Sequence, residues 1–272
     1  MITFPNAKIN VGLYITRRRP DGYHDLETLF YPIDLCDILE IVPAQDDNTT
    51  LTITGIPVDG DVEKNLVMRA YRLLQSQYDL PAVEIHLHKV IPFGAGLGGG
   101  SSDASYTLRM LRDMFALPLS DDNLAEMASK LGADCPFFIY NRPLIATGIG
   151  DCFSSTNFSM QGKYIVLVKP PIAVSTAEAY AHVTPNTPSQ SLSEQVAQPI
   201  DKWHDVVSND FEKSVFPIHP RIAAIKQRLY DMGATYASMS GSGSSVFGIF
   251  DTPPACTDAF AGCFVWQGTC KV

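Results

Sequence analysis

A dense run of glycines lies near the middle of the chain, in the stretch VIPFGAGLGGGSSDASYTLRMLRDMF (residues 90–115). After the glycines, apolar residues recur at helical spacing from Ala104 to Phe115, so the run leads into a long helix. Such a loop points successive backbone N–H groups at an anion, and glycine lets a phosphate approach the backbone closely. We therefore favour a phosphate site over a flexible turn. The predicted site comprises Pro92, Phe93, Gly94, Ala95, Gly96, Leu97, Gly98, Gly99, Gly100, Ser101 and Ser102.

The segment GAGLGG also matches the G-x-G-x-x-G pattern of dinucleotide-binding proteins, but its surroundings do not fit. That pattern requires a continuously apolar strand before the glycines, whereas residues 82–90 alternate between apolar and polar side chains. The next acidic residues, Asp121 and Asp122, lie in the first turn of a helix that Ser120 caps. No G-K-[ST] follows the glycines either. A nicotinamide cofactor and a Walker loop are both excluded.

Composition limits the kinds of partner. The 272 residues are 46% hydrophobic and carry a net charge of -9, so we expect two domains and neither a nucleic-acid partner nor an anionic membrane surface. The N-terminal residues do not resemble a signal peptide and no apolar run is long enough to span a bilayer, so the expected location is the cytoplasm. The six cysteines are scattered and include no C-x-x-C pair, so we expect neither a zinc site nor a disulfide framework.

Strands and helices are mixed along the chain rather than strictly alternating, which predicts an α+β protein. A turn-rich stretch at residues 142–157 predicts a boundary between domains of residues 1–155 and 156–272. Residues 184–195 are polar and proline-bearing and predict a surface loop. The expected strands are 7–16, 51–55, 82–90, 163–168 and two within 234–250, and the expected helices are 65–77, 104–115, 120–131 and 221–232.

Two charged residues stand in apolar surroundings. Asp134 precedes the run CPFFIY at a predicted helix-to-strand junction, where its carboxylate must be paired or solvated. An aspartate that binds backbone amides in a loop is as good an interpretation there as a catalytic one. Lys8 lies between Ala7 and Ile9 in an otherwise apolar strand, and spacing alone favours a solvated lysine at a sheet edge.

The segment PFGAGLGGGSSDA (92–104) resembles the glycine-rich motif of the GHMP kinases, the superfamily of galactokinase, homoserine kinase and mevalonate kinase. Three further segments resemble, in order along nearly the whole chain, the branch of this superfamily that serves the non-mevalonate isoprenoid pathway. They are FPNAKINVGLYITRRRPDGYHDLETLFYPIDL (4–35), LGADCPFFI (131–139) and SGSGSSVFGIF (240–250). Cys135, where the family often has an aliphatic residue, and a short segment after Phe264 depart from the pattern.

The resemblance implies a two-domain GHMP-kinase-like fold with mixed and antiparallel sheets, packed helices and an active site in the cleft between the domains. The N-terminal domain would bind the nucleotide and the C-terminal domain the substrate. The implied reaction is ATP-dependent phosphorylation of the 2-hydroxyl of 4-(cytidine 5'-diphospho)-2-C-methyl-D-erythritol, with Mg²⁺. Two alternatives stay open: another small-molecule kinase of the superfamily, of homoserine or mevalonate type, and a catalytically inactive nucleotide-binding protein.

The resemblance also assigns roles to residues. Asp134 would be the general base toward the acceptor hydroxyl, and Lys8 would orient that hydroxyl and lower the barrier electrostatically. Ser102 is a candidate Mg²⁺ ligand, and Asn65 would lie near the adenine unless it is an ordinary residue of a helix N-terminus. The acceptor side would include Asn10, Ser240, Gly241, Ser242 and Gly243, although the serine-glycine loop also fits a hairpin turn.

A cytosine site is the last expectation. Asp21-Gly22 is a strong turn signal, so Tyr23 and His24 should project from a loop. We expect Tyr23 to stack on the base and His24 to bond its edge, while Tyr180 forms the opposite wall. The competing interpretations are a turn histidine and a tyrosine in the core of a helix.

Overall fold

The computed structural model describes residues 1–58, 60–255 and 259–272. It divides into two compact units, each assembled from separate segments of the chain. The first unit comprises residues 1–7, 35–93 and 98–141, and the second comprises residues 8–34, 94–97 and 142–272. The division into a nucleotide-binding domain (residues 1–155) and a substrate-binding domain (residues 156–272) stays a prediction.

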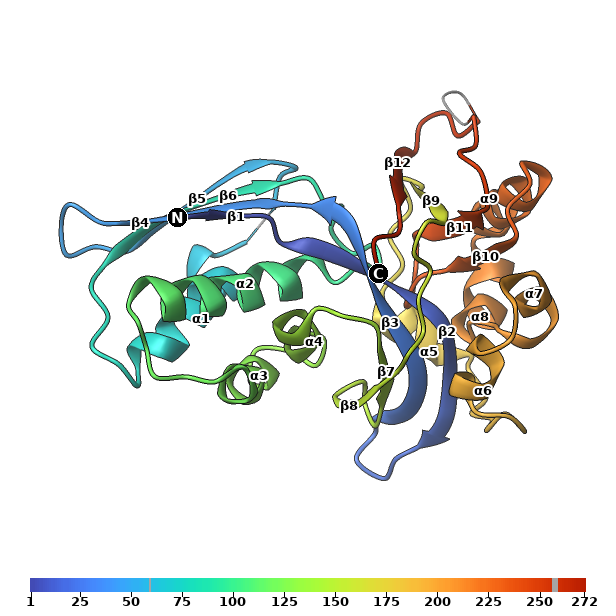
Figure 1. The fold of residues 1–272 in the computed structure, drawn as a ribbon, viewed down its shortest axis with the longest axis horizontal. Coiled ribbons are helices and arrows are strands. Elements are labelled where there is room, and N and C mark those ends of the chain that lie inside the picture. Colours follow the sequence, from blue (N-terminus) through green and yellow to red (C-terminus); the bar gives the residue numbers. More distant parts are fainter. Residues whose placement is uncertain (59, 256–258) are drawn as a thin grey trace. The chain divides into compact units, whose positions relative to one another are not determined.

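The first unit contains one four-stranded sheet in the order β1-β4-β6-β5 (Figure 1). β5 and β6 run parallel, and the other neighbours run antiparallel. The described elements are β1 (Ile2–Thr3), β4 (Ile38–Pro43), β5 (Thr50–Gly55), η1 (Val62–Lys64), α1 (Leu66–Gln75), β6 (Val83–Lys89), α2 (Gly99–Met114), α3 (Asp121–Ser129) and α4 (Cys135–Tyr140).

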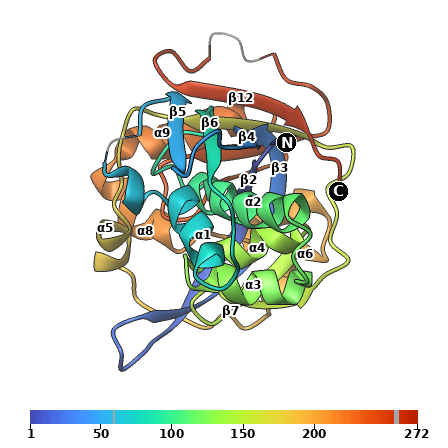
Figure 2. The same cartoon turned by 90° about the vertical axis from the view of Figure 1, so that its left-hand side faces the viewer.

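Alternation along β6 decides which face of this sheet is covered. Val83, Ile85 and Leu87 are buried, while the polar residues between them are exposed. The buried side chains join a core with residues of β4 and of helices α1, α2 and α3. Figure 2 shows α1 and α2 lying beneath β4, β5 and β6. The sheet therefore places the end of β6, and the glycine loop that follows it, next to the start of α2.

The second unit holds most of two further four-stranded sheets, ordered β2-β3-β7-β8 and β10-β11-β9-β12. In the second of these sheets all neighbours are antiparallel. The strands are β2 (Asn6–Arg18), β3 (His24–Cys36), β7 (Leu144–Thr147), β8 (Cys152–Ser155), β9 (Tyr164–Lys169), β10 (Tyr236–Met239), β11 (Val246–Phe250) and β12 (Phe264–Thr269). The predicted α+β class with mixed and antiparallel sheets is confirmed.

Helices of the second unit cover the sheet that contains β10 and β11. Ile222, Ile225 and Leu229 of α9 enter a core with Val166, Val246 and other strand residues. Its helices are α5 (Thr176–Ala181), α6 (Leu192–Val196), η2 (Ile200–Lys202), α7 (Trp203–Val206), α8 (Phe211–Ile218) and α9 (Pro220–Asp231).

Two expectations about elements are wrong. The run after Asp134 is the short helix α4, not a strand, because Pro136 is tolerated in a first helical turn and the apolar side chains are buried on all sides. The predicted loop at residues 184–195 includes the beginning of α6, where Ser191 and Glu194 form a capping box.

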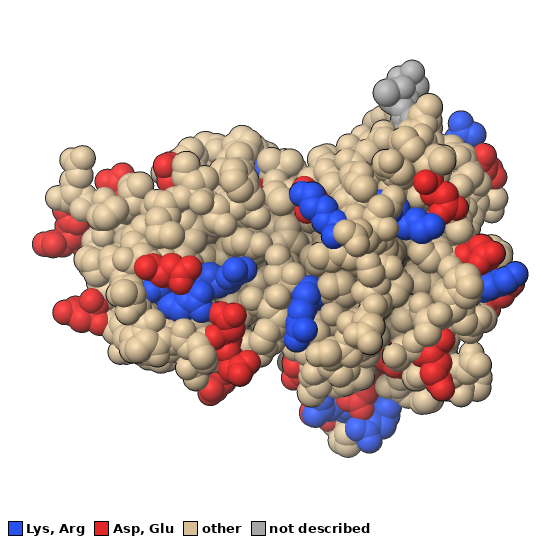
Figure 3. Space-filling view, in the orientation of Figure 1, with Lys and Arg blue, Asp and Glu red and all other residues tan. Residues whose placement is uncertain are grey.

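Charged side chains are dispersed over the visible surface. Figure 3 shows Lys and Arg beside Asp and Glu on this face rather than gathered in one basic stripe. Within the described ranges, no helix combines the length and the apolar character needed to cross a bilayer.

The core of the first unit yields a stability prediction. Leu124 on α3 is fully buried, so Leu124→Ala should lower the free energy of unfolding by about 2–5 kcal/mol, through lost burial and a cavity. Urea unfolding measures this difference. Glu126→Ala, on the exposed face of the same helix, is the control and should change stability by less than about 0.5 kcal/mol. Equal losses in both variants would contradict the assigned core.

Candidate active site

The glycine loop alternates left-handed glycines with buried apolar side chains. Gly94, Gly96 and Gly98 have φ angles of +59°, +73° and +70°, and the side chains of Ala95 and Leu97 between them are buried. Residues other than glycine rarely adopt such angles. Gly98 is the N-cap of α2, and the amide of Ser102 donates the first helical hydrogen bond to its carbonyl oxygen at 2.9 Å. The first N–H groups of α2 thus form a helix N-terminus without a capping side chain, which suits an anion.

A second glycine-rich loop holds the first half of this one in place. Residues 240–245 connect β10 and β11, so the prediction of a loop between two strands is confirmed. The Ser240 hydroxyl donates to the carbonyl oxygen of Gly96 at 2.8 Å, and the amide of Ser245 donates to that of Ala95 at 3.3 Å. A Cβ atom on Gly96 would overlap the carbonyl oxygen of Ser240. Only glycine fits at this position.

Asn209, which the sequence analysis missed, supports the second loop. Its side chain is buried, and its amide nitrogen donates to the carbonyl oxygens of Met239 and Gly241 at 2.8 Å each. Its own Oδ1 accepts from the amide of Phe211 at 3.0 Å. In sequence, Asn209 is merely a polar residue before a helix, and its contacts with residues 30 positions away leave no local signal.

Lys8 is not the solvated lysine that spacing alone predicts. Only 4% of its surface is exposed, and its ammonium lies 4.5 Å from the centroid of the Phe30 ring. The ammonium donates to Asn10 Oδ1 at 2.6 Å, and Asn10 Nδ2 donates to Thr28 Oγ at 3.0 Å. Because these bonds fix the orientation of the Asn10 amide, its oxygen always faces the lysine.

Lys8 and Asn10 also contact the two glycine-rich loops. The amide of Lys8 donates to the carbonyl oxygen of Leu97 at 2.9 Å, and the amide of Asn10 donates to the Ser240 hydroxyl at 3.2 Å. The structure therefore brings together three predicted site segments of the second unit: the strand at Lys8 and Asn10, the loop at Gly96 and Leu97, and the loop at Ser240.

Asp134 lies in the first unit, next to the start of α2. It is the N-cap residue of α4, yet its side chain makes no capping hydrogen bond to that helix. The next residue, Cys135, ties α4 to α2, because its carbonyl oxygen accepts from the Ser105 hydroxyl at 2.7 Å. Burial raises the pKa of the Cys135 thiol to about 11, so this cysteine is inert at neutral pH. The partly exposed Asp134 carboxylate is thereby held near the N-terminus of α2.

The predicted cytosine residues are partly assembled. The His24 ring stacks on Tyr180 with centroids 4.7 Å apart and an interplanar angle of 25°. The ring of Phe211 also contacts Tyr180, edge-on with centroids 4.7 Å apart. Tyr23 is 62% exposed. An aromatic surface of Tyr23, His24 and Tyr180 is thus available, although His24 itself occupies one face of Tyr180.

Asn65 and Ser102 occupy the starts of two helices. Asn65 caps α1, with its Oδ1 accepting from the amide of Val67 at 2.9 Å, so a contact with adenine would come from its Nδ2 or backbone. The hydroxyl of Ser102 is fully buried and has no hydrogen-bond partner among the described residues. An orphaned hydroxyl of this kind fits a polar ligand at the loop.

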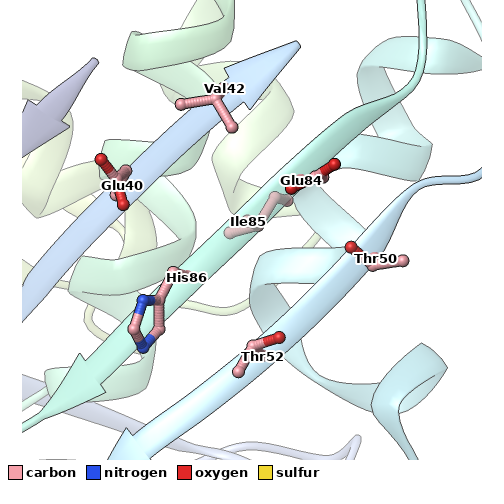
Figure 4. Close-up of a pocket in the computed structure, with 7 residues that line it drawn as sticks. All are labelled: Glu40, Val42, Thr50, Thr52, Glu84, Ile85 and His86. Carbon is pink, nitrogen blue, oxygen red and sulfur yellow. The ribbon is translucent and has the colours of Figure 1, made fainter. Parts of the chain in front are cut away.

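Neither of the two described cavities is lined by the glycine loop. The first, about 230 Å³, lies over strands β4, β5 and β6 and is lined by Glu40, Glu84 and His86 among others (Figure 4). Its two carboxylates would repel a phosphate. The second, about 550 Å³, is lined by residues of β2 and β3 among others. Two of its lining residues, Arg17 and Asp25, form an ion pair.

Two family models match this chain. The family models "GHMP kinases N terminal domain" and "GHMP kinases C terminal" match residues 65–142 and 194–259. The first range contains the glycine loop and Asp134, and the second contains Ser240 to Ser245. A relative from Parabacteroides distasonis is 53% identical over 98% of this chain and 99% of its own. The chain belongs to the GHMP kinase family.

Two relatives of this GHMP kinase have the same name. The Parabacteroides protein and one from Bacteroides fragilis, 51% identical over the full length of both chains, are each named 4-diphosphocytidyl-2-C-methyl-D-erythritol kinase. A crystal structure of 4-(cytidine 5'-diphospho)-2C-methyl-D-erythritol kinase is similar with a TM-score of 0.81 and 31% identity, covering 100% of both chains. The mevalonate kinase of Methanococcus jannaschii, at 14% identity and a TM-score of 0.69, shares the fold.

Two glycines of the loop provide a matched test of its packing. A Cβ atom on Gly94 would meet nothing within 4 Å, whereas one on Gly96 would overlap the Ser240 carbonyl oxygen. Both have left-handed angles, so Gly94→Ala should cost about 1–2 kcal/mol of unfolding free energy from backbone strain alone. Gly96→Ala should cost clearly more because the two loops must separate. Chemical unfolding of both variants compares these costs, and a Gly94 variant as damaged as the Gly96 variant would contradict the packing.

Proposed function

We propose that the protein transfers the γ-phosphoryl group of ATP to the 2-hydroxyl of 4-(cytidine 5'-diphospho)-2-C-methyl-D-erythritol. The observation that carries the proposal is the full-length similarity, at 53% identity, to a relative named for this acceptor. The residues support it: the chain retains Lys8, Asp134, both glycine-rich loops and the aromatic group at Tyr23, His24 and Tyr180.

The phosphates of ATP bind at the glycine loop and the N-terminus of α2. Left-handed glycines at positions 94, 96 and 98 leave the backbone accessible, and the first turn of α2 supplies N–H donors. This local arrangement suits a protein whose net charge of -9 offers no general attraction for an anion. Asn65 contacts the adenine from the start of α1.

Magnesium accompanies the nucleotide in this proposal. Mg²⁺ needs few protein ligands, and the orphaned Ser102 hydroxyl in the first turn of α2 is the residue present that would hold it. Bound there, the ion would supply positive charge against the charge that develops on the transferred group.

Asp134 and Lys8 have different roles at the acceptor hydroxyl in this proposal. The Asp134 carboxylate accepts the proton of the hydroxyl as the hydroxyl oxygen attacks phosphorus. The Lys8 ammonium, held by Asn10, orients the hydroxyl and stabilises negative charge in the transition state. Burial strengthens the electrostatic effect of Lys8, since little water screens its charge.

The cytidine end of the acceptor lies against Tyr23, His24 and Tyr180. An aromatic ring binds any base through its face, whereas a hydrogen bond from His24 distinguishes cytosine from uracil by its edge. Backbone groups of Ser240, Gly241, Ser242 and Gly243 contact the acceptor, because the Ser240 hydroxyl is already engaged by Gly96. The proposed location is the cytoplasm.

The proposal is tested by measuring ADP release from ATP with three acceptors supplied separately: the cytidine diphosphate derivative, mevalonate and homoserine. Only the first should support turnover, and mass spectrometry should find one added phosphate on it. Turnover with mevalonate or homoserine alone would replace the proposed acceptor with that of another GHMP kinase. ADP release with none of them would contradict the proposed reaction.

Asp134→Asn should lower kcat by about 10² or more while ATP affinity changes little, because the amide keeps the shape but cannot accept the proton. Steady-state kinetics and calorimetric titration with ATP measure the two quantities. Asp113→Asn replaces an exposed carboxylate of the same unit, paired with Arg112, and should leave kcat unchanged. Near-normal turnover in Asp134→Asn would remove Asp134 from the mechanism.

His24→Ala should reduce the preference for a cytosine over a uracil acceptor by about tenfold, the value of one lost edge hydrogen bond. Tyr180→Phe keeps the stacking ring and should keep the preference. The ratio of kcat/KM for the two acceptors measures it. If His24→Ala discriminated as well as the wild type, another residue would read the base.

A further inference from the structure

A buried cluster of three charged residues lies in the first unit, and the proposed chemistry leaves it without a role. The Lys89 ammonium donates to Asp103 Oδ2 at 2.6 Å and also to a carboxylate oxygen of Asp37. The three residues are 5%, 2% and 0% exposed, respectively. They come from three separate places: the end of β6, the second turn of α2, and the residue between β3 and β4.

Asp37 connects this cluster to the entrance of the glycine loop. Its Oδ1 accepts hydrogen bonds from the amides of Val90 and Ile91, at 2.6 and 2.8 Å. These two residues stand directly before Pro92, where the loop begins. The conformation of the chain entering the loop therefore depends on one buried carboxylate.

Lys89 and Asp103 connect the same entrance to α2. Asp103 is the fifth residue of α2, and Lys89 is the last residue of β6. Gly99, the first residue of α2, packs so closely that a Cβ atom there would lie 2.9 Å from Ile91 Cγ2 and 3.5 Å from Lys89 Nζ. The cluster thus ties the residues before the loop to the helix after it.

Stability alone is a poor explanation for such a cluster. Removing three charged groups from water is costly, and well-packed apolar residues in place of a buried ion pair are often as stable or more so. The cost is visible at Asp103. Burial raises the pKa of its carboxyl group above the usual value, against the lowering effect of Lys89 and with a further rise from Asp37. The cluster is therefore better explained by the way it fixes the residues before the glycine loop against α2 than by a gain in stability.

We propose that Asp37, Lys89 and Asp103 are positioning residues for the nucleotide. They fix the residues before the glycine loop against the first turns of α2, so that the N–H groups at the start of this helix stay in phosphate-binding geometry. The cluster itself does not touch the nucleotide. This inference rests on the proposed binding of ATP phosphates at the loop.

The test measures binding of a non-hydrolysable ATP analogue by calorimetry, without acceptor. Lys89→Met keeps the length of the side chain and removes both charge contacts. We expect its Kd for the analogue to rise about tenfold or more, with acceptor KM within about twofold of wild type. Because the acceptor is absent from the binding measurement, the result judges the cluster even if the acceptor proves to be a different alcohol.

Leu124→Ala is the control for simple loss of stability. It weakens the same unit through α3, away from the loop, and should lower Tm while the Kd for the analogue stays at the wild-type value. If Lys89→Met lowered Tm in the same way but bound the analogue normally, the cluster would be structural only and the proposal would be overturned.

Asp103→Asn keeps the proposal testable if Lys89→Met fails to fold. The amide has the shape of the carboxylate, can still accept from Lys89, and leaves the contact between Lys89 and Asp37 in place. We expect a smaller rise in Kd, about threefold to fivefold, with kcat unchanged at saturating ATP. Unchanged affinity in this variant, or a fall in kcat without a change in affinity, would contradict a role in positioning the nucleotide.

Discussion

The close approach of Gly96 to the carbonyl oxygen of Ser240 is the constraint on which the site depends. It requires glycine at position 96, and the hydrogen bond from the Ser240 hydroxyl to the Gly96 carbonyl oxygen maintains it. The same hydroxyl accepts from the amide of Asn10, whose side chain in turn holds the Lys8 ammonium. One contact between two glycine-rich loops thus connects the backbone at Gly96 to Lys8 through Asn10. Each glycine-rich motif in the sequence is therefore needed to position the other.

Two buried lysines of this acidic protein are stabilised by the groups that surround them. Lys8 and Lys89 are both buried, and each is held by hydrogen bonds from its ammonium to oxygen atoms. Their environments differ: Lys8 faces a neutral amide and an aromatic ring, while two carboxylates surround Lys89. Burial alone lowers the pKa of Lys89, but Asp103 and Asp37 outweigh it and raise that pKa above its usual value. The charge of Lys89 is thereby neutralised within its cluster.

Elements with strong local periodicity were predictable from the sequence, and contacts between distant residues were not. The alternation of residues 82–90 gives β6, and the helical spacing after the glycines gives α2, each within a few residues of its bounds. The short helices α5 to α8 carry too few turns for a clear period, and tertiary packing decides them. The glycine loop, Lys8 and Asp134 are candidate site residues that the sequence and the family resemblance suggest, but the burial of Lys8 against Phe30, in another strand, has no local signal. Sequence reasoning did not identify several buried polar residues, because the partners cited here lie 14 or more positions away in the chain. They are Thr28, Asn209 and the cluster of Asp37, Lys89 and Asp103.

The central claim is that the backbone around Gly98 binds the phosphates of ATP while the aromatic group at His24 binds the acceptor. Amide NMR of the isotopically labelled protein tests this assignment directly, with each ligand added alone. A non-hydrolysable ATP analogue should shift the amide signals of Gly98, Gly99 and Gly100, and leave those of Tyr23 and His24 in place. The cytidine diphosphate acceptor should do the reverse. Shifts at Tyr23 and His24 on addition of the ATP analogue, with the signals of the three glycines unmoved, would contradict the account.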